Sequence, residues 1–102
     1  MKWKRGSFDI VWTSYPAVWT ERHIKRVKGV MCTEEMIGAH REGRLFHITD
    51  LPTGARICHA VTRKEAIEEY EIAYRRKVQK KREEKEYEKF IEEFRRLKNG
   101  NA

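Results

Sequence analysis

Alternating apolar and polar positions predict short β-strands in the first two thirds of the chain. Residues 7–12 form one such strand. The β-rich runs 45–51 and 55–61 flank a Pro-Thr-Gly sequence at 52–54, where Pro suits the first turn position and Gly accepts a positive φ. We therefore expect a hairpin over residues 44–61.

The register of this hairpin depends on the length of its loop. A three-residue loop pairs Leu51 with Ala55, whereas a loop one residue longer turns one strand's side chains to the other face. With the shorter loop, the facing pairs are Asp50 with Arg56, Ile48 with Cys58, and His47 with His59. The opposite charges of the first pair favour this register.

Two segments before the hairpin have weaker patterns. Residues 33–36 place acidic side chains where a helix would begin, and Gly43 could end it, which predicts a short helix over about 34–42. Residues 15–30 fit either a helix opened by Pro16 or a strand. A strand is favoured, because a hairpin alone is marginally stable and needs a third partner.

The start of a C-terminal helix is clearly marked. Thr62 and Glu65 form a T-x-x-E capping box, and Val61 and Ala66 have the spacing of a hydrophobic staple. No Pro or Gly occurs over residues 63–98. The sequence therefore predicts one continuous helix of about 50 Å.

This predicted helix carries two apolar stripes that point in roughly opposite directions. The first consists of Ile67, Tyr70, Tyr74 and Val78, and the second of Tyr87, Phe90, Ile91, Phe94 and Leu97. The first stripe can cover the sheet of the same chain. The second is too apolar to stay exposed without reason, since each large side chain gains about 1.5–3 kcal/mol on burial.

Three arrangements could account for the second stripe. Another protomer could cover it, the helix could break near 81–86 and fold back, or the end of the helix could stay unpacked until it binds a target. Residues 79–86 contain no turn former, which favours self-association, with a dimer as the first guess. The predicted fold is α+β, with an antiparallel sheet of about three strands, one short helix and one long C-terminal helix. Residues 1–61 form the small domain, 62–98 the helix that packs on it and extends to a partner, and 99–102 a disordered tail.

Composition limits the class of protein. The 102 residues include 23 Lys and Arg against 16 Asp and Glu, which gives a net charge of +7. No run approaches the roughly 18 apolar residues of a membrane span, and the start of the chain lacks the apolar core of a signal peptide. We expect a cytoplasmic protein with reduced thiols at Cys32 and Cys58. The abundance of Lys, Arg and Glu, with only three amide residues, is typical of thermophilic proteins.

The sequence shows few signs of catalysis. It has no glycine-rich phosphate loop, C-x-x-C, H-E-x-x-H or G-x-S-x-G motif. His47 and His59 could share a metal, but Cys58 points to the opposite face and zinc needs three or four ligands. Cys32 and His40 lack a third group that would orient a nucleophile and base. We expect no enzyme, no cofactor and no metal.

Anion binding is the best supported chemistry. Basic residues interleaved with tryptophans suit single-stranded nucleic acid, because cations bind phosphates and flat rings stack on bases. A further run of six positive charges lies within residues 75–82. The candidate anion-binding residues are Lys2, Trp3, Lys4, Arg5, Arg22, Lys25, Arg26, Lys28, Arg75, Arg76, Lys80 and Lys81.

The function predicted from these features is a small basic binding or regulatory protein, oligomeric through its C-terminal helix, with nucleic acid as the anionic partner. Two alternatives remain open. One is an accessory or anti-defence inhibitor that grips a host protein with the second stripe, since the basic, aromatic-rich α+β character resembles that of phage-borne accessory proteins. The other is sequestration of an anionic nucleotide between protomers.

Overall fold

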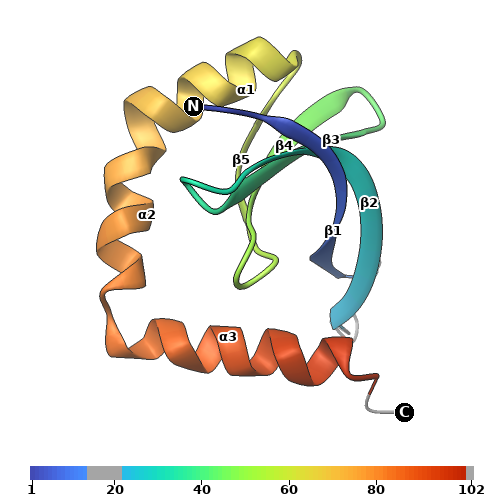
Figure 1. Ribbon diagram of the computed structural model, residues 1–102, viewed down its shortest axis with the longest axis vertical. Coiled ribbons are helices and arrows are strands. Elements are labelled where there is room, and N and C mark those ends of the chain that lie inside the picture. The colour runs from blue at the N-terminus through green and yellow to red at the C-terminus, as the bar shows by residue number, and fades with distance from the viewer. Residues whose placement is uncertain (14–21, 101–102) are drawn as a thin grey trace.

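The computed structural model describes residues 1–13 and 22–100. Five antiparallel strands follow one another in a single sheet of order β1-β2-β3-β4-β5, and a series of helical segments wraps around one side of it (Figure 1). The strands are β1 (Lys4–Thr13), β2 (Arg22–Cys32), β3 (Ile37–Glu42), β4 (Leu45–Asp50) and β5 (Arg56–Ala60). The helical segments are α1 (Arg63–Glu69), the π-turn η1 (Tyr70–Tyr74), α2 (Arg75–Arg82) and α3 (Lys85–Lys98).

The prediction of about three strands is wrong, because the sheet has five. The strand expected over 7–12 lies within β1, and the hairpin expected over 44–61 is β4–β5. For residues 15–30, the strand interpretation is confirmed from Arg22 onward, while 14–21 lie outside the described residues. Each added strand gives its neighbours the backbone partners that a lone hairpin lacks.

The short helix expected over 34–42 is replaced by a tight turn and strand β3. Met36 ends the turn with a φ of 55°, and β3 then pairs with both β2 and β4. Ile37 and Ala39 face the helices, whereas His40 faces the other side of the sheet. Pairing on both edges and burial of these side chains outweigh the weak local preference of the two glutamates for a helix.

The hairpin register is confirmed for two of its three expected pairs. Ile48 lies opposite Cys58 and His47 opposite His59. A bulge after Ile48 shifts the register, so that Arg56 pairs with Thr49. The expected pair of Asp50 with Arg56 is therefore wrong, and the Asp50 carboxylate is used elsewhere.

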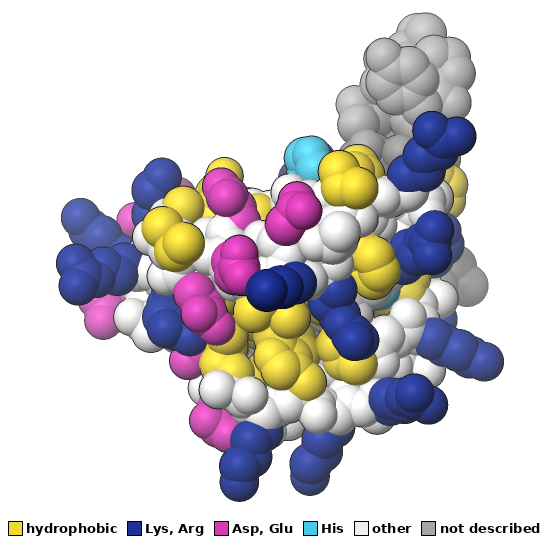
Figure 2. Space-filling view, turned by 90° about the horizontal axis from the view of Figure 1, so that it is seen from above, with side chains coloured by type: hydrophobic (Ala, Val, Ile, Leu, Met, Phe, Trp, Pro, Cys, Tyr) yellow, Lys and Arg dark blue, Asp and Glu magenta, His cyan; other side chains and the backbone are white. Residues whose placement is uncertain are grey.

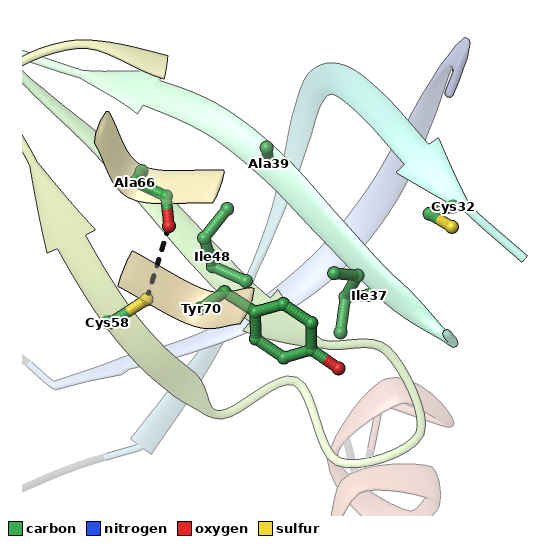
Figure 3. Close-up of a cluster of buried hydrophobic side chains, with 7 residues drawn as sticks. All are labelled: Cys32, Ile37, Ala39, Ile48, Cys58, Ala66 and Tyr70. Atoms are coloured by element: carbon green, nitrogen blue, oxygen red, sulfur yellow. Dashed lines mark hydrogen bonds between the residues drawn. The ribbon is translucent and has the colours of Figure 1, made fainter. Parts of the chain in front are cut away.

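The main core lies between the sheet and α1–η1. It contains the buried side chains of Cys32, Ile37, Ala39, Ile48, Cys58, Ala66 and Tyr70. Figure 3 shows Tyr70 reaching from the helical side toward Ile37, and the Cys58 thiol donating to the Ala66 carbonyl oxygen at 3.8 Å. A second cluster of Phe8, Ile10 and Val27 lies on the opposite, concave face of the sheet.

The start and first stripe of the C-terminal helix are confirmed. The Thr62 hydroxyl accepts a hydrogen bond from the Glu65 backbone N–H at 3.1 Å, as a capping box requires. Tyr70 is fully buried, and Ile67, Tyr74 and Val78 pack against the same core. The π-turn in the middle of this stripe was not expected from the sequence.

The prediction of one continuous helix over 63–98 is wrong. The chain turns at Glu83–Glu84, and α3 runs beneath the sheet in a different direction from α2 (Figure 1). Tyr87 and Phe94 of the second stripe are buried within this chain, with Phe94 packed on Gly54 in the β4–β5 turn. This packing removes the geometric reason for a second protomer, and the oligomeric state stays a prediction.

The remaining members of the second stripe are only partly covered. Ile91 and Leu97 are half-buried, and Phe90 is 40% exposed. Among the helices that the structure describes, none combines the length and apolar character needed to cross a membrane.

Candidate binding cleft

A buried charge network holds the corner between α2 and α3. We call these two helices together the arm. Arg82, at the end of α2, binds Asp50 through its Nε at 3.1 Å. Its other nitrogens donate to the backbone carbonyls of Glu35 at 2.9 Å and Met36 at 3.0 Å. The Tyr87 hydroxyl donates to the second Asp50 oxygen at 2.6 Å. These contacts tie both ends of the corner to the β2–β3 and β4–β5 turns.

The network is shielded from water. Asp50 and Arg82 have side chains that are 7% and 19% exposed. Burial together with the Asp50 hydrogen bond raises the pKa of the Tyr87 hydroxyl well above its ordinary value, so this group stays a donor. The Thr53 hydroxyl donates to the same Asp50 oxygen at 2.7 Å, so the carboxylate is fully engaged without the Arg56 partner expected from the sequence.

A second contact fixes the arm at its other end. The Glu35 carboxylate accepts from the Tyr70 hydroxyl at 3.0 Å and from Arg75 Nε at 2.9 Å. Burial tends to raise the pKa of Glu35, but these two donors outweigh it and hold the pKa below its ordinary value. Burial and the Glu35 hydrogen bond raise the pKa of Tyr70 to about 12.

The corner of the arm is held against the turns of the sheet, and between the arm and the strands lies a cleft of about 470 Å³, which we call the arm cleft. Much of its lining is apolar and is contributed by the strands, by α2 and by α3. Val11 and Ile57 contribute from the strands, Val78 from α2, and Leu97 from α3. Tyr74, Tyr87, Phe90 and Phe94 add aromatic rings. A flat apolar group can therefore lie against rings in this cleft.

Cations also line the arm cleft. The Lys77 ammonium lies 5.5 Å from the centre of the Tyr74 ring, and the Lys81 ammonium 5.7 Å from that of Phe90. Arg56 contributes a third cation. None of the three makes an ion pair within the described part of the chain. The acids of the cleft are engaged, since Asp50 binds Arg82 and Glu93 binds Arg22 at 2.6 Å.

Four of the predicted anion-binding cations are held in ion pairs. The pairs are Arg22 with Glu93 at 2.6 Å, Lys25 with Glu42 at 2.6 Å, Arg26 with Asp9 at 3.3 Å, and Arg75 with Glu35 at 2.9 Å. These carboxylates compete with a phosphate for the same cations. Of the four, only Arg22 lies on the arm cleft.

The other predicted cations are exposed and not brought together. They are Lys2, Lys4, Arg5, Lys28, Arg76, Lys80 and Lys81. Figure 2 shows Lys and Arg side chains distributed around the margin of one face, with acidic side chains among them on one half. Only Lys81 of this group lines the arm cleft. The candidates predicted from the sequence included neither Arg56 nor Lys77, although Lys77 and Lys81 have the i, i+4 spacing of one helix face.

The predicted aromatic partners have different environments. Trp3 is half-buried and packs against the main core, which is a structural role. Trp12 is 42% exposed, and its ring lies 4.9 Å from that of His23. Trp19 lies outside the described residues. Trp12 is therefore the more exposed of the two tryptophans in the described chain.

A smaller hollow of about 390 Å³ lies on the concave face of the sheet, and we call it the sheet hollow. A row of imidazoles crosses this face, with His40 stacked on His47 at 5.3 Å and His47 lying 5.8 Å from His59. His40 is only 4% exposed. Its Nε2 lies 3.5 Å from a Glu42 oxygen, at the long limit of a hydrogen bond, and its Nδ1 has no hydrogen-bond partner.

Burial lowers the pKa of both His40 and His47 below the ordinary 6.5, and for His47 the neighbouring His40 and Arg56 add to the effect. The unfolded chain therefore takes up protons before the folded chain as the pH falls through 6.5. We expect the free energy of unfolding to be highest above that pH and to decrease below it, by at most about 1.4 kcal/mol per pH unit for each histidine.

Urea unfolding at about pH 7.5 and about pH 5.5 checks this. This interval lies above the titration of Glu35 and Glu42, whose pKa values are lowered from 4.5. The double variant His40→Phe/His47→Gln should lose most of the pH dependence, while His59→Gln, at the exposed end of the row, should keep it. An unchanged dependence in the double variant would contradict the assignment.

The residues considered for catalysis or metal binding do not form a complete site within the described residues. Cys32 faces the helices and His40 the concave side of the sheet, so they do not form a nucleophile and base. Both cysteines are buried free thiols, and burial raises the pKa of Cys58 to about 11. Within residues 1–13 and 22–100, no group of three or more His, Cys, Asp or Glu is placed to hold a metal ion.

No protein-family model, curated protein or solved structure matches this chain. What the protein binds must therefore be inferred from the chemistry of its own residues.

Proposed function

We propose that this is a non-enzymatic binding protein whose arm cleft takes a nucleotide unit, either free or within a single strand of nucleic acid. The observation that carries the proposal is the combination, in the lining of one cleft, of aromatic rings with three cations that have no ion pair in the described chain. A nucleotide has the matching parts, a flat base and an anionic phosphate.

Size and ring content support a base in the cleft. A volume of about 470 Å³ lies within the range of about 300–1,000 Å³ that is usual for small-molecule sites. Stacking of one base on an aromatic side chain contributes about 1–3 kcal/mol. Tyr74 of η1 and Phe90 of α3 offer rings from two different elements, and the half-buried Leu97 and Val78 add apolar surface to the same cleft.

The charge balance supports an anionic group. The Lys77 and Lys81 ammonium groups lie over rings of the cleft without a carboxylate, so a phosphate meets no competing acid at either group. The acids Asp50 and Glu93 are neutralised by Arg82 and Arg22. The cleft therefore presents an excess of positive charge to a ligand that enters it.

The distribution of the other cations favours a nucleotide or single strand over a duplex. A duplex presents two regular rows of phosphates and is bound by a matching array of cations. Here four predicted cations are paired with carboxylates, and the exposed ones are scattered (Figure 2). A unit of a few nucleotides needs only the cations that converge on one cleft.

The double variant Lys77→Ala/Lys81→Ala is expected to weaken binding of a short, fluorescein-labelled oligothymidylate about tenfold, equal to about 1.4 kcal/mol. The slope of log K against log salt should fall by about 1.4, because two phosphate contacts are lost. Fluorescence anisotropy at several salt concentrations measures both quantities.

The matched control is Arg76→Ala/Lys80→Ala, which removes the same charge from the same helix but at positions outside the cleft. It should change affinity less than threefold. Equal losses in the two double variants would show that net charge alone attracts the oligonucleotide, and an absence of binding to the unaltered protein would overturn the proposal.

A further inference from the structure

The sheet hollow has chemistry of its own that the arm cleft does not use. Trp12 and Ile10 offer an aromatic face and an aliphatic contact, while His40, His47 and Thr49 offer polar groups. Neutral imidazoles carry both a donor and an acceptor, which is what the edge of a base requires. The hollow is therefore equipped for a heterocycle rather than for a simple inorganic anion.

A buried imidazole with an unpartnered nitrogen, that of His40, supports a ligand site in this hollow. His40 is 96% removed from solvent, its Nδ1 has no hydrogen-bond partner within the described residues, and its Nε2 has only a Glu42 oxygen at 3.5 Å, also on the hollow. A buried polar group left without a partner costs about 1–3 kcal/mol. Its ring is held between Phe8, edge-on at 5.9 Å, and His47, stacked at 5.3 Å. This position fixes the ring in the wall of the hollow.

The two depressions share two lining residues. Arg56 lines both the arm cleft and the sheet hollow, and so does Val11. The Val11 backbone N–H donates to the Gly54 carbonyl oxygen at 2.9 Å, which brings the end of β1 against the β4–β5 turn, next to Arg56. A ligand that enters both depressions therefore passes the Arg56 guanidinium, which has no ion pair in the described chain.

We propose that the ligand is a single strand of at least two nucleotides, with one base in the arm cleft, the next in the sheet hollow, and the linking phosphate bound by Arg56. This inference rests on the proposed function, because it places the first nucleotide in the arm cleft. It adds a minimum ligand length and a second set of contacts. Arg56 can bind the phosphate through two parallel N–H donors, as guanidinium groups commonly do.

Occupying both depressions with one molecule has a measurable consequence. Once one base is bound, the second is held near its site at an effective concentration in the millimolar range. Affinity should then rise steeply from one nucleotide to two. A protein with only one site would show little gain, because the second nucleotide would remain in solvent.

The test is calorimetric titration with thymidine monophosphate, with the phosphorylated thymidine dinucleotide and with a tetranucleotide. The unaltered protein should bind the dinucleotide at least tenfold more tightly than the mononucleotide. Trp12→Ala and His47→Ala should each bring the dinucleotide affinity down toward that of the mononucleotide. His59→Ala is the matched control, because it removes the neighbouring imidazole of the same row without touching the hollow, and it should keep the full gain.

The outcomes separate the two proposals. Mononucleotide and dinucleotide binding of equal strength would overturn the two-nucleotide inference and leave the arm cleft as a nucleotide site. A gain that survives in both Trp12→Ala and His47→Ala would also overturn it, since the second base would then lie elsewhere. If none of the three ligands binds, the proposed function itself fails.

Discussion

Replacing Arg82 by Met is expected to lower the free energy of unfolding by about 3–5 kcal/mol, the usual cost of removing one partner of a buried ion pair. Arg82 binds Asp50 and two backbone carbonyls in the β2–β3 turn. Its loss leaves the 7% exposed Asp50 carboxylate with only hydroxyl donors, from Thr53 and Tyr87. Since small domains are stable by about 5–15 kcal/mol, urea unfolding should show a large shift.

Two further variants make this result specific. Arg76→Met removes an exposed arginine from the same helix and should change the unfolding free energy by less than about 0.5 kcal/mol. Tyr87→Phe removes one hydrogen bond to the same carboxylate and should cost about 1.5–3 kcal/mol, which keeps the protein folded and measurable. If Arg82→Met and Arg76→Met behave alike, the charge network does not hold the corner.

Phe94→Ala is expected to destabilise the protein by about 3–5 kcal/mol, as is usual for truncating a buried phenylalanine. Phe94 is 3% exposed, and its ring packs directly on Gly54 in the β4–β5 turn. A Cβ at position 54 would lie only 2.4 Å from the Phe94 ring, so the absence of a side chain there is what lets α3 approach the turn. Differential scanning calorimetry or urea unfolding measures the loss.

Phe90→Ala is the matched control on the same helix. Phe90 is 40% exposed at the arm cleft, so its truncation should cost less than about 1 kcal/mol of stability while weakening ligand binding. Equal stability losses at the two positions would indicate that α3 is not packed as described. Both rings line the cleft, and the pair thus separates the buried side chain that also holds the arm from the exposed one that does not.

Local signals predicted those parts of the fold that depend on local interactions. The Thr62 cap, the stripe of Tyr70 and the Pro-Thr-Gly turn each involve residues close together in sequence. The strand β3 could not be predicted in this way. Glu34 and Glu35, just before this strand, favour a helix start locally, and only pairing with β2 and β4 makes the extended form more stable.

The break at Glu83–Glu84 shows the same limit. Neither residue favours a turn, so the sequence around the break predicts helix. The bend is stabilised by Arg82 and Tyr87 meeting Asp50, more than 30 residues earlier in the chain, and by Phe94 meeting Gly54. The energy of these long-range contacts exceeds the small helical preference of the two glutamates. Periodicity could identify the second stripe but not the surface that covers it.

The basic character of the candidate site could be predicted from the sequence, but the residues that line it could not. The basic run at 75–82 was recognised, but its members have separate roles in the structure. Arg75 binds Glu35, Arg82 binds Asp50, and Lys77 and Lys81 line the arm cleft. Which cations remain without a carboxylate depends on residues far away in sequence. Composition alone therefore overestimates the number of cations that are available to a ligand.

Nuclear Overhauser contacts between the Phe94 ring and Gly54 test the central claim, that α3 turns back onto the sheet of its own chain and so encloses the arm cleft. In uniformly labelled protein we expect strong cross-peaks from the ring protons of Phe94 to the α-protons of Gly54. A mixture of labelled and unlabelled chains, recorded so that only contacts between different molecules appear, should lack these peaks. Their absence from the first spectrum, or their presence in the second, would show that the helix extends away or packs on another copy.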